Sequence, residues 1–319
     1  MTSKWEALIS EMKSGSIRAL TRLITRVENR EPGWMEAMKR VYADTGKARV
    51  VGITGAPGTG KSTLTSRMTR TLVDQGFKVG VIAVDPSSPF SGGALLGDRV
   101  RMMDVSDLNG VFVRSMATRG VLGGLNQSAR DVAKIMDAFG KDFILIETVG
   151  VGQDEVEVVR TADLVLVVCV PGQGDAIQTI KAGIMEIADI FIVNKADLKG
   201  ADQVVMDIEA MLELDMDTEA PRPPILKTVA IKGNGIVELV QKTHELLKTL
   251  NKQTVWQEER IREELIGLLE KEIVGLIKKN WNKDGSLDQA VRQVMAREND
   301  PYSIVQEIIA PLTPLLPGA

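Results

Sequence analysis

Hydrophobic residues follow two different patterns along this chain. In residues 3–44 they recur at helical spacing from Ala7 to Val27, and Glu31-Pro32-Gly33 interrupts the pattern. Further along are six short apolar runs rich in β-branched residues, at 49–54, 78–84, 142–147, 163–170, 187–193 and 223–229. Helical patterns separate most of these runs. Apolar strands that alternate with helices indicate an α/β fold with a mostly parallel sheet covered on both faces.

The composition changes again after about residue 250. WQEERIREELIGLLEKEIVGLIKKNW predicts one long amphipathic helix, whose apolar stripe contains Leu265, Leu268, Leu269, Ile273, Leu276 and Ile277. Such a stripe can pack on the protein's own domain or on a second subunit. We therefore expect three parts: a helical N-terminal extension (1–48), an α/β domain (49–250) and a helical C-terminal arm (251–319).

Composition and charge argue against nucleic-acid-binding, secreted and membrane-spanning proteins. The chain has 319 residues, 44% of them hydrophobic, and a net charge of −4, which gives no electrostatic reason to expect nucleic acid or an anionic membrane as a partner. Its only cysteine, Cys169, lies in the apolar run LVLVVCV and is expected to be a small buried side chain. The N-terminal segment lacks the apolar core of a signal peptide, and no run reaches membrane-spanning length. We expect a soluble, cytoplasmic protein.

A phosphate-binding motif follows the first apolar strand. GAPGTGKS matches G-x-x-x-x-G-K-[ST], and a helical pattern comes directly after it, which is the strand–loop–helix setting that the motif requires. Its glycines allow successive backbone amides to turn toward a phosphate. Lys61 is expected to neutralise the β and γ oxygens. The predicted phosphate site consists of Gly55, Ala56, Pro57, Gly58, Thr59, Gly60, Lys61 and Ser62.

A magnesium ion is expected beside this loop. The Ser62 hydroxyl is one predicted ligand, and Glu147, at the tip of the strand DFILIE, supplies a carboxylate. Gly150 lies three residues later, where an amide can reach the γ-phosphate. Asp85 is a further candidate ligand or a turn residue. Asp98 is either a switch ligand or half of an ion pair with a neighbouring arginine.

A base-reading motif, NKAD, directly follows the fifth apolar run. The Asp197 carboxylate can accept both N1–H and N2–H of guanine, while Asn194 meets the O6/N7 side and the Lys195 stem covers the ring. Adenine lacks this pair of donors and would leave the carboxylate unpaired. Backbone amides at Val229 and Ala230 are expected to contribute to the base site. The two motifs together predict GTP or GDP as the ligand.

Hydrolysis depends on Lys61 and Glu147 and on a residue that positions water. Many GTPases carry a glutamine directly after the switch glycine, but Val151 stands there in this chain. Gln153, two residues further along, either reaches the site after rearrangement or is a surface residue. No arginine finger can be assigned. We expect slow turnover by the protein alone and acceleration by a partner.

The motifs belong to longer strings: GAPGTGKST, DPSSPFSGGALLGDRVRM, RSMATRGVLGGLN, ETVGVGQDEVEV, QTIKAGIMEIADIFIVNKADL and WQEERIREELI. Together these strings resemble the MeaB/ArgK family of P-loop GTPases over nearly the whole chain. The resemblance implies a P-loop GTPase fold that binds GTP or GDP with Mg²⁺. It further implies a homodimer held partly by the C-terminal arm. The implied function is a chaperone that gates adenosylcobalamin delivery to methylmalonyl-CoA mutase, or a related mutase, and protects that enzyme from inactivation.

The resemblance also implies roles for individual residues. It adds Thr63 to the phosphate site and makes Asp85 and Asp98 metal-linked switch acids. Residues 178–189 match a third switch that communicates with the mutase. Within that segment Lys181 is the strongest candidate, the alternative being an ordinary surface lysine.

Three other functions are alternatives to a GTPase chaperone. A GTPase that inserts nickel or another metal usually carries clustered His and Cys ligands, whereas this chain has one His, His244, and one Cys. A kinase or ATPase linked to amino-acid-binding transport proteins would need an acceptor site and a base, and no separate motif supplies them. The third is a structural nucleotide binder that never hydrolyses GTP.

Overall fold

The computed structural model describes residues 2–85, 103–117, 124–148, 161–172, 188–214, 222–250, 254–281 and 285–310. The chain divides into two compact units, residues 1–255 and 256–319. The first unit contains the sheet, and the regular elements described in the second are all helices.

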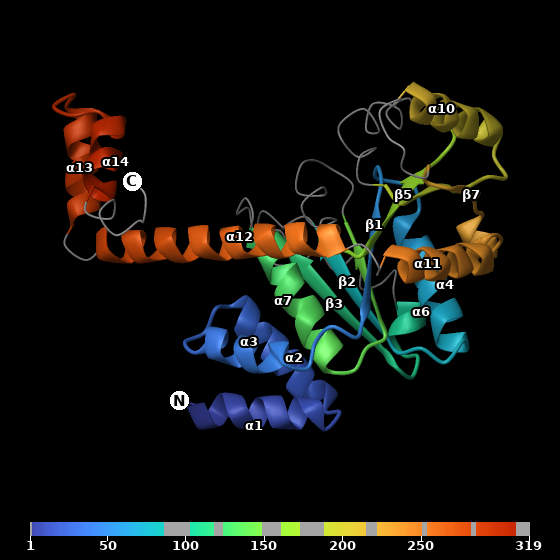
Figure 1. The fold of residues 1–319 in the computed structure, drawn as a ribbon, viewed down its shortest axis with the longest axis horizontal. Coiled ribbons are helices and arrows are strands. Elements are labelled where there is room, and N and C mark those ends of the chain that lie inside the picture. The colour runs from blue at the N-terminus through green and yellow to red at the C-terminus, as the bar shows by residue number, and fades with distance from the viewer. Residues whose placement is uncertain are drawn as a thin grey trace. The chain divides into compact units, whose positions relative to one another are not determined.

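A seven-stranded parallel sheet forms the centre of the first unit (Figure 1). Its strand order is β3-β2-β4-β1-β5-β6-β7. The strands are β1 (Arg49–Thr54), β2 (Val79–Asp85), β3 (Val111–Ala117), β4 (Phe143–Glu147), β5 (Leu164–Cys169), β6 (Ile190–Val193) and β7 (Ile225–Lys227). Because every pairing is parallel, all the carboxyl ends lie at one edge, where α/β proteins place their ligands. The predicted α/β class with a parallel sheet is confirmed.

Strand β3 is an element that the apolar pattern did not predict. Its sequence, VFVRSMA, places Arg114 and Ser115 inside the run. It is an edge strand that pairs only with β2, from Val79↔Val111 to Asp85↔Ala117. An edge strand needs less continuous hydrophobicity than a central one, so its pattern is weaker.

Helices cover both faces of the sheet. On one face, α4 (Lys61–Asp74), α6 (Met103–Ser106) and α11 (Ile236–Leu250) share a buried apolar cluster with the central strands. On the other, α7 (Gly124–Ala138) covers the β2–β4 side and α10 (Ala201–Leu214) covers β5 and β6. Strand residues such as Ile53 and Leu145 are fully buried. Burial on both faces explains why these strands are apolar throughout.

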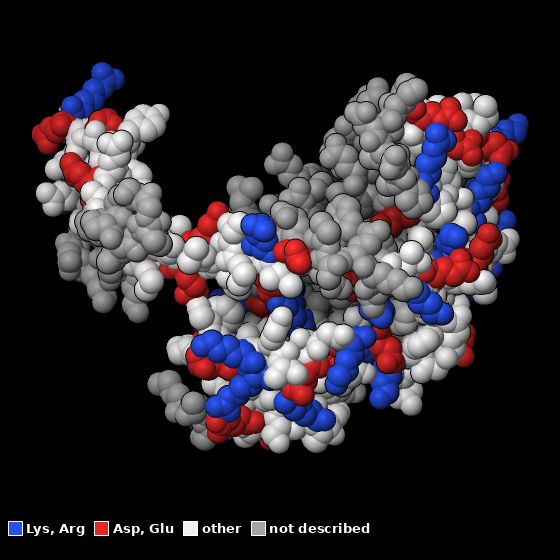
Figure 2. Space-filling view, in the orientation of Figure 1, with Lys and Arg blue, Asp and Glu red and all other residues white. Residues whose placement is uncertain are grey.

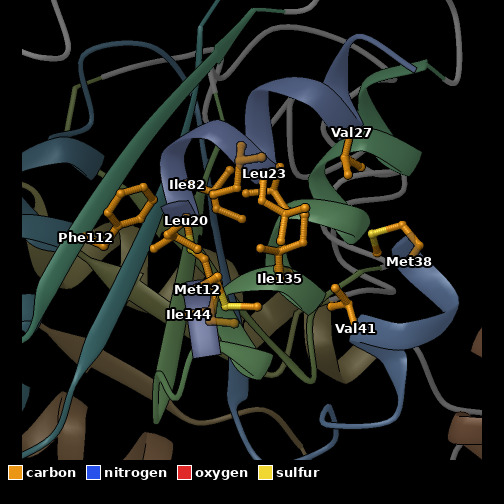
Figure 3. Close-up of a cluster of buried hydrophobic side chains, with 14 of the residues drawn as sticks. Met12, Leu20, Leu23, Val27, Met38, Val41, Ile82, Phe112, Ile135 and Ile144 are labelled. Atoms are coloured by element: carbon orange, nitrogen blue, oxygen red, sulfur yellow. The ribbon is translucent and has the colours of Figure 1, made fainter. Parts of the chain in front are cut away.

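Three N-terminal helices pack against α7 and the neighbouring strands of the sheet. They are α1 (Thr2–Lys13), α2 (Ile17–Glu28) and α3 (Trp34–Tyr42). Figure 3 shows Leu20 and Leu23 of α2 directed toward Ile135 of α7 and Ile82 of β2. The pattern predicted the break before α3 but not the one between α1 and α2. Ser16 makes that second break by capping α2, its hydroxyl accepting from the Ala19 amide at 3.2 Å.

Two partly buried ion pairs fasten these helices to the rest of the first unit. Arg114 of β3 donates to Glu28 of α2. Arg30 lies 2.7 Å from Asp131 of α7 and stacks on Trp34 with 3.9 Å to the ring centroid. Removing one partner of such a pair would leave a charge without its counterion in a partly buried setting. The N-terminal helices therefore pack on the α/β domain through charge as well as hydrophobic contact.

The second unit contains α12 (Thr254–Trp281), α13 (Ser286–Met295) and α14 (Pro301–Ile309). The long helix predicted near 256–281 is present as α12. Asp300 caps α14 by accepting from the amides of Tyr302 and Ser303 at 2.9 and 3.0 Å. Among the described residues, none of the helices combines the length and hydrophobicity that a membrane crossing requires.

Charged side chains of both signs are mixed on the visible face of the first unit (Figure 2). Over the described residues of that face, lysines and arginines alternate with aspartates and glutamates. The N-terminal helices carry two exposed ion pairs, Arg40–Glu6 and Lys39–Glu36, each at 2.6 Å. Neighbouring opposite charges largely cancel one another beyond about 10 Å at moderate salt.

The Asp137 side chain holds the loop that leads into β1. This buried carboxylate of α7 accepts from the backbone amides of Gly46, Lys47 and Ala48 at 2.6, 3.3 and 2.9 Å. One carboxylate thus accepts from three consecutive amides. The contact joins the loop after α3 to α7 and so sets where the first strand begins.

Asp137→Ala should therefore lower the free energy of unfolding by about 1–2 kcal/mol, since it leaves the buried Ala48 amide unpaired and removes the acceptor of the amides of Gly46 and Lys47, two exposed residues. The exposed Glu36→Ala variant is the control and should leave the free energy of unfolding nearly unchanged. Urea unfolding followed by circular dichroism measures both. Equal stability of the two variants would contradict the role given to Asp137.

Candidate nucleotide site

The phosphate loop runs from β1 to α4 in a conformation that requires glycine. Gly55 has φ +142°, and a Cβ there would lie 2.2 Å from the Val168 carbonyl oxygen. Gly60 has φ +91°, and its Cβ would lie 2.6 Å from Asn194 Nδ2. Both positions combine positive φ with close packing. The loop is therefore pressed against β5 on one side and the base-reading motif on the other.

Lys61 begins α4 and lies across the loop. Its ammonium group donates to the carbonyl oxygens of Gly55 at 2.6 Å and Ala56 at 3.1 Å, and the residue is 6% exposed. The Thr59 hydroxyl also donates to Ala56, at 2.9 Å. A cation at the amino end of a helix is a suitable environment for phosphate oxygens.

Ser62 and Glu147 meet beside this loop. The Ser62 hydroxyl donates to Glu147 Oε1 at 2.5 Å, and Glu147 is buried at the carboxyl end of β4. A hydroxyl and a carboxylate at this distance fit the oxygen ligands that Mg²⁺ prefers. Asp85 ends the neighbouring strand β2, two positions beyond the residue that pairs with Glu147. Its backbone therefore lies at the same edge; its side chain is outside the described residues.

The Asn194 side chain joins the phosphate loop to the base-reading loops. Its Nδ2 donates to the Thr59 carbonyl oxygen at 2.8 Å. Its Oδ1 accepts from the Thr228 hydroxyl at 3.1 Å and from the Ala230 amide at 3.0 Å. The residue is 2% exposed. One buried amide thus connects three segments that are far apart in the sequence, a small network whose members are mutually satisfied.

Lys195 and Asp197 occupy the outer side of the same motif. Lys195 has φ +55°, and its ammonium group donates to the Gly58 carbonyl oxygen at 2.8 Å. Its stem therefore extends from the base motif toward the phosphate loop. Asp197 Oδ2 accepts from Lys232 at 2.8 Å, and this contact holds the pKa of the Asp197 carboxyl below its usual range. The carboxylate is charged near neutral pH.

Val229 and Ala230 lie where the sequence predicted, beside Asn194, but their amides are engaged within the protein. The Val229 amide donates to Asn234 at 3.1 Å, and the Ala230 amide donates to Asn194. Ala230 also begins the short helix η3 (Ala230–Lys232). In this arrangement the turn supports the base site through Asn194, and direct contact of these amides with a base stays a prediction.

Several predicted residues lie outside the described part of the chain, namely Asp98, Gly150, Gln153 and Lys181. Thr63 is exposed in the first turn of α4, and Pro57 and Gly58 are exposed at the tip of the phosphate loop. Sequence reasoning missed Lys232, which pairs with Asp197. A lysine two residues after the predicted base loop was the one signal that could have identified it.

The fold and this site define a P-loop protein of the GTPase class, with phosphate and base motifs on neighbouring loops of a parallel sheet. The chain belongs to the family described as "Methylmalonyl Co-A mutase-associated GTPase MeaB", whose model matches residues 20–283. The resemblance expected from the sequence strings is thereby confirmed.

Individual relatives agree with this assignment. A protein of Pyrococcus abyssi is 47% identical over 314 residues, which cover 95% of this chain and 97% of its own length. GTPase ArgK of Escherichia coli is 36% identical over 239 residues, or 72% of each chain. The crystal structure of a protein described as "LAO/AO transport system kinase" superposes with a TM-score of 0.70, is 25% identical and covers 98% of both chains.

The two ends of α4 offer a matched test of the site. Gly60 and Gly76 both have φ +91°, but a Cβ at Gly76 meets nothing within 4 Å. Gly76→Ala should cost about 1–2 kcal/mol of stability from positive φ alone and leave nucleotide affinity unchanged. Gly60→Ala must also displace Asn194, so nucleotide affinity should fall by about tenfold or more.

Calorimetric titration with GTP and thermal unfolding of both variants would measure these effects. If Gly60→Ala and Gly76→Ala bind GTP equally well, the contact between the phosphate loop and Asn194 does not organise the site.

Proposed function

We propose that this protein is a GTP-dependent switch that hydrolyses GTP and acts as a chaperone for an adenosylcobalamin-dependent mutase. The observation that carries the nucleotide part is the buried Asn194 side chain, which connects the phosphate loop and the base loops into one site. Gly55–Thr63 would bind the phosphates. Asn194, Lys195 and Asp197 would bind guanine, and the turn at Val229 and Ala230 would support Asn194.

Magnesium would be held at Ser62 and Glu147, with Asp85 and Asp98 as further acids. The close approach of the Ser62 hydroxyl to Glu147 Oε1 supports this assignment, because it brings two oxygen ligands together next to the phosphate loop. When bound, the metal supplies positive charge to the phosphate oxygens. Lys61 would orient those oxygens, and Glu147 would hold the metal and its water.

Hydrolysis would be slow in the protein alone. Among the candidates for catalysis, Lys61 and Glu147 lie at the phosphate loop. Gly150, Gln153 and Lys181 belong to the segments that we expect to act as switches. We propose that Gln153 acts on the attacking water when a partner is bound and that Lys181 reports the nucleotide state to the partner. Such gating is typical of GTPases whose switch loops respond to the γ-phosphate.

The client would be methylmalonyl-CoA mutase or a related cobalamin-dependent acyl-CoA mutase. The family description, which names an association with methylmalonyl-CoA mutase, supports this proposal. GTP would gate delivery of adenosylcobalamin to the mutase and protect the mutase from inactivation. We place this activity in the cytoplasm.

A homodimer would form through the C-terminal arm. On α12, large apolar side chains are exposed at intervals of one or two turns: Ile261 at 52%, Leu265 at 63%, Leu269 at 61% and Leu276 at 62%. A row of this length along one helix face is unusual for a surface that meets only water. A second copy of the chain, presenting the same row, would cover it with an isologous contact.

Two alternatives have less support. A nickel-inserting GTPase would need exposed metal ligands, but Cys169 is buried in β5, where burial raises the pKa of its thiol to about 12. His244 lies against the rings of Phe77 and Phe143, with centroids at 5.3 and 5.0 Å. The kinase or ATPase alternative is supported only by the name of the transport system kinase that shares this fold. Phosphate transfer from GTP or ATP to an amino-acid-binding transport protein would favour it.

The chaperone proposal is tested by measuring GTP hydrolysis by the full chain, alone and with each of several purified cobalamin mutases. We expect slow turnover alone and stimulation by the true client. Ser62→Ala should reduce Mg²⁺-dependent hydrolysis by about 100-fold, since a metal supplies several kcal/mol of stabilisation. Ser66→Ala, one turn further along α4, is the control. Normal GTP binding without stimulation by any mutase would contradict the chaperone role, and a structural binder would show no hydrolysis at all.

The dimer is tested by the double substitution Leu265→Glu/Leu269→Glu. Two charges in an apolar contact should convert a dimer to a monomer, measured by sedimentation equilibrium, while GTP binding by the α/β domain is retained. Glu270→Gln on the same helix is the control. A wild-type chain that sediments as a monomer, or a double variant that remains dimeric, would exclude this interface.

A further inference from the structure

A lysine outside the nucleotide motifs contacts the carboxylate proposed to read the base. Lys232 Nζ donates to Asp197 Oδ2 at 2.8 Å. Lys232 is the last residue of η3, and Asp197 lies in the loop after β6. The contact therefore connects the two loops at the base end of the site, on the side opposite the phosphates.

The turn that presents this lysine is held in place by other contacts. Arg67 of α4 donates to the Ile231 carbonyl oxygen at 2.8 Å. Val229 and Asn234 form an antiparallel bridge across the turn. Gly235 has φ +76°, and a Cβ there would lie 2.3 Å from a backbone oxygen. The backbone that carries the lysine is therefore held in a defined position.

The acceptor capacity of Asp197 allows the lysine and a base to bind at the same time. An ionised carboxylate has about four acceptor positions, and Lys232 uses one of them. Guanine needs two, for N1–H and N2–H. All three donors can therefore be accommodated on one carboxylate. Adenine presents an acceptor at N1 and lacks the pair of N–H donors that guanine has there. It therefore cannot donate two hydrogen bonds to the Asp197 carboxylate.

The contact should gain strength when a base covers it. In the structure the Asp197 and Lys232 side chains are 39% and 59% exposed, and ion pairs this exposed contribute little because water screens them. A planar base docked on the carboxylate removes water from one side of it and lowers the local dielectric constant. A carboxylate in that setting needs a counterion beside it.

We propose that Lys232 is a specificity-determining residue of the nucleotide site: it holds the Asp197 carboxylate charged and oriented for the two donors of guanine, and so raises affinity for guanine over adenine nucleotides. This inference rests on the proposed binding of GTP. Because Lys232 acts at the base end, GTP and GDP affinities depend on it equally, and turnover at saturating GTP does not.

The test compares three variants of the full chain by calorimetric titration with GTP, GDP and ATP. Lys232→Met should weaken GTP and GDP binding by about three- to tenfold and leave ATP binding unchanged. Lys232→Arg should restore most of the affinity, because it keeps the charge. Lys227→Met is the matched control: it removes an exposed ion pair of the same kind, with Asp202, and should bind all three nucleotides as the wild type does.

Three outcomes would overturn the role of Lys232. They are an unchanged GTP affinity in Lys232→Met, an equal weakening of GTP and ATP, and a Lys232→Arg variant that behaves like Lys232→Met. Lys232→Gln provides a second neutral variant if Lys232→Met folds poorly. A wild-type chain without guanine preference would contradict the GTP proposal itself, whereas a selective wild type with an equally selective Lys232→Met contradicts only the lysine's role.

Discussion

The buried amide of Asn194 is the interaction on which the rest of the site depends. The sheet brings the ends of β1, β6 and β7 to one edge, but it leaves their loops independent of one another. Asn194 removes that independence by contacting Thr59 on the phosphate side and Thr228 and Ala230 on the base side. When a nucleotide contacts the phosphate loop, the base-reading loops are therefore already positioned to bind it, and the reverse also holds. Such preorganisation reduces the ordering cost of binding.

Charge is distributed along this site in a way that suits a nucleotide. At the phosphate end, Lys61 is buried against backbone carbonyl oxygens, and the Ser62–Glu147 pair offers oxygen ligands beside it. At the base end, the Asp197 carboxylate is exposed and paired with Lys232. The cation that we propose binds phosphates and the anion that we propose accepts from the base thus lie at opposite ends of one row of loops. The parallel sheet makes this possible, since all its strands end on the same side.

Much of this could be predicted from sequence because the motifs are local. The phosphate loop, the NKAD run and the central strands each depend on a few consecutive residues, and the structure places them at one edge of the sheet. Strand β3 was missed because Arg114 breaks its apolar run, and Arg114 is charged because it pairs with Glu28 of a distant helix. The Asp197–Lys232 pair was also missed, because its two residues lie on loops that are separate in the sequence. A contact between separate loops depends on the tertiary fold and has no local pattern.

The central claim is that one guanine nucleotide binds per chain at this edge of the sheet. Calorimetric titration of the full chain with GTP and with ATP, in the presence of Mg²⁺, tests it most directly. The account predicts one site per chain for GTP and affinity for ATP lower by at least about 100-fold, because adenine cannot satisfy the Asp197 carboxylate. Equal affinity for the two nucleotides, or no binding of GTP, would contradict it.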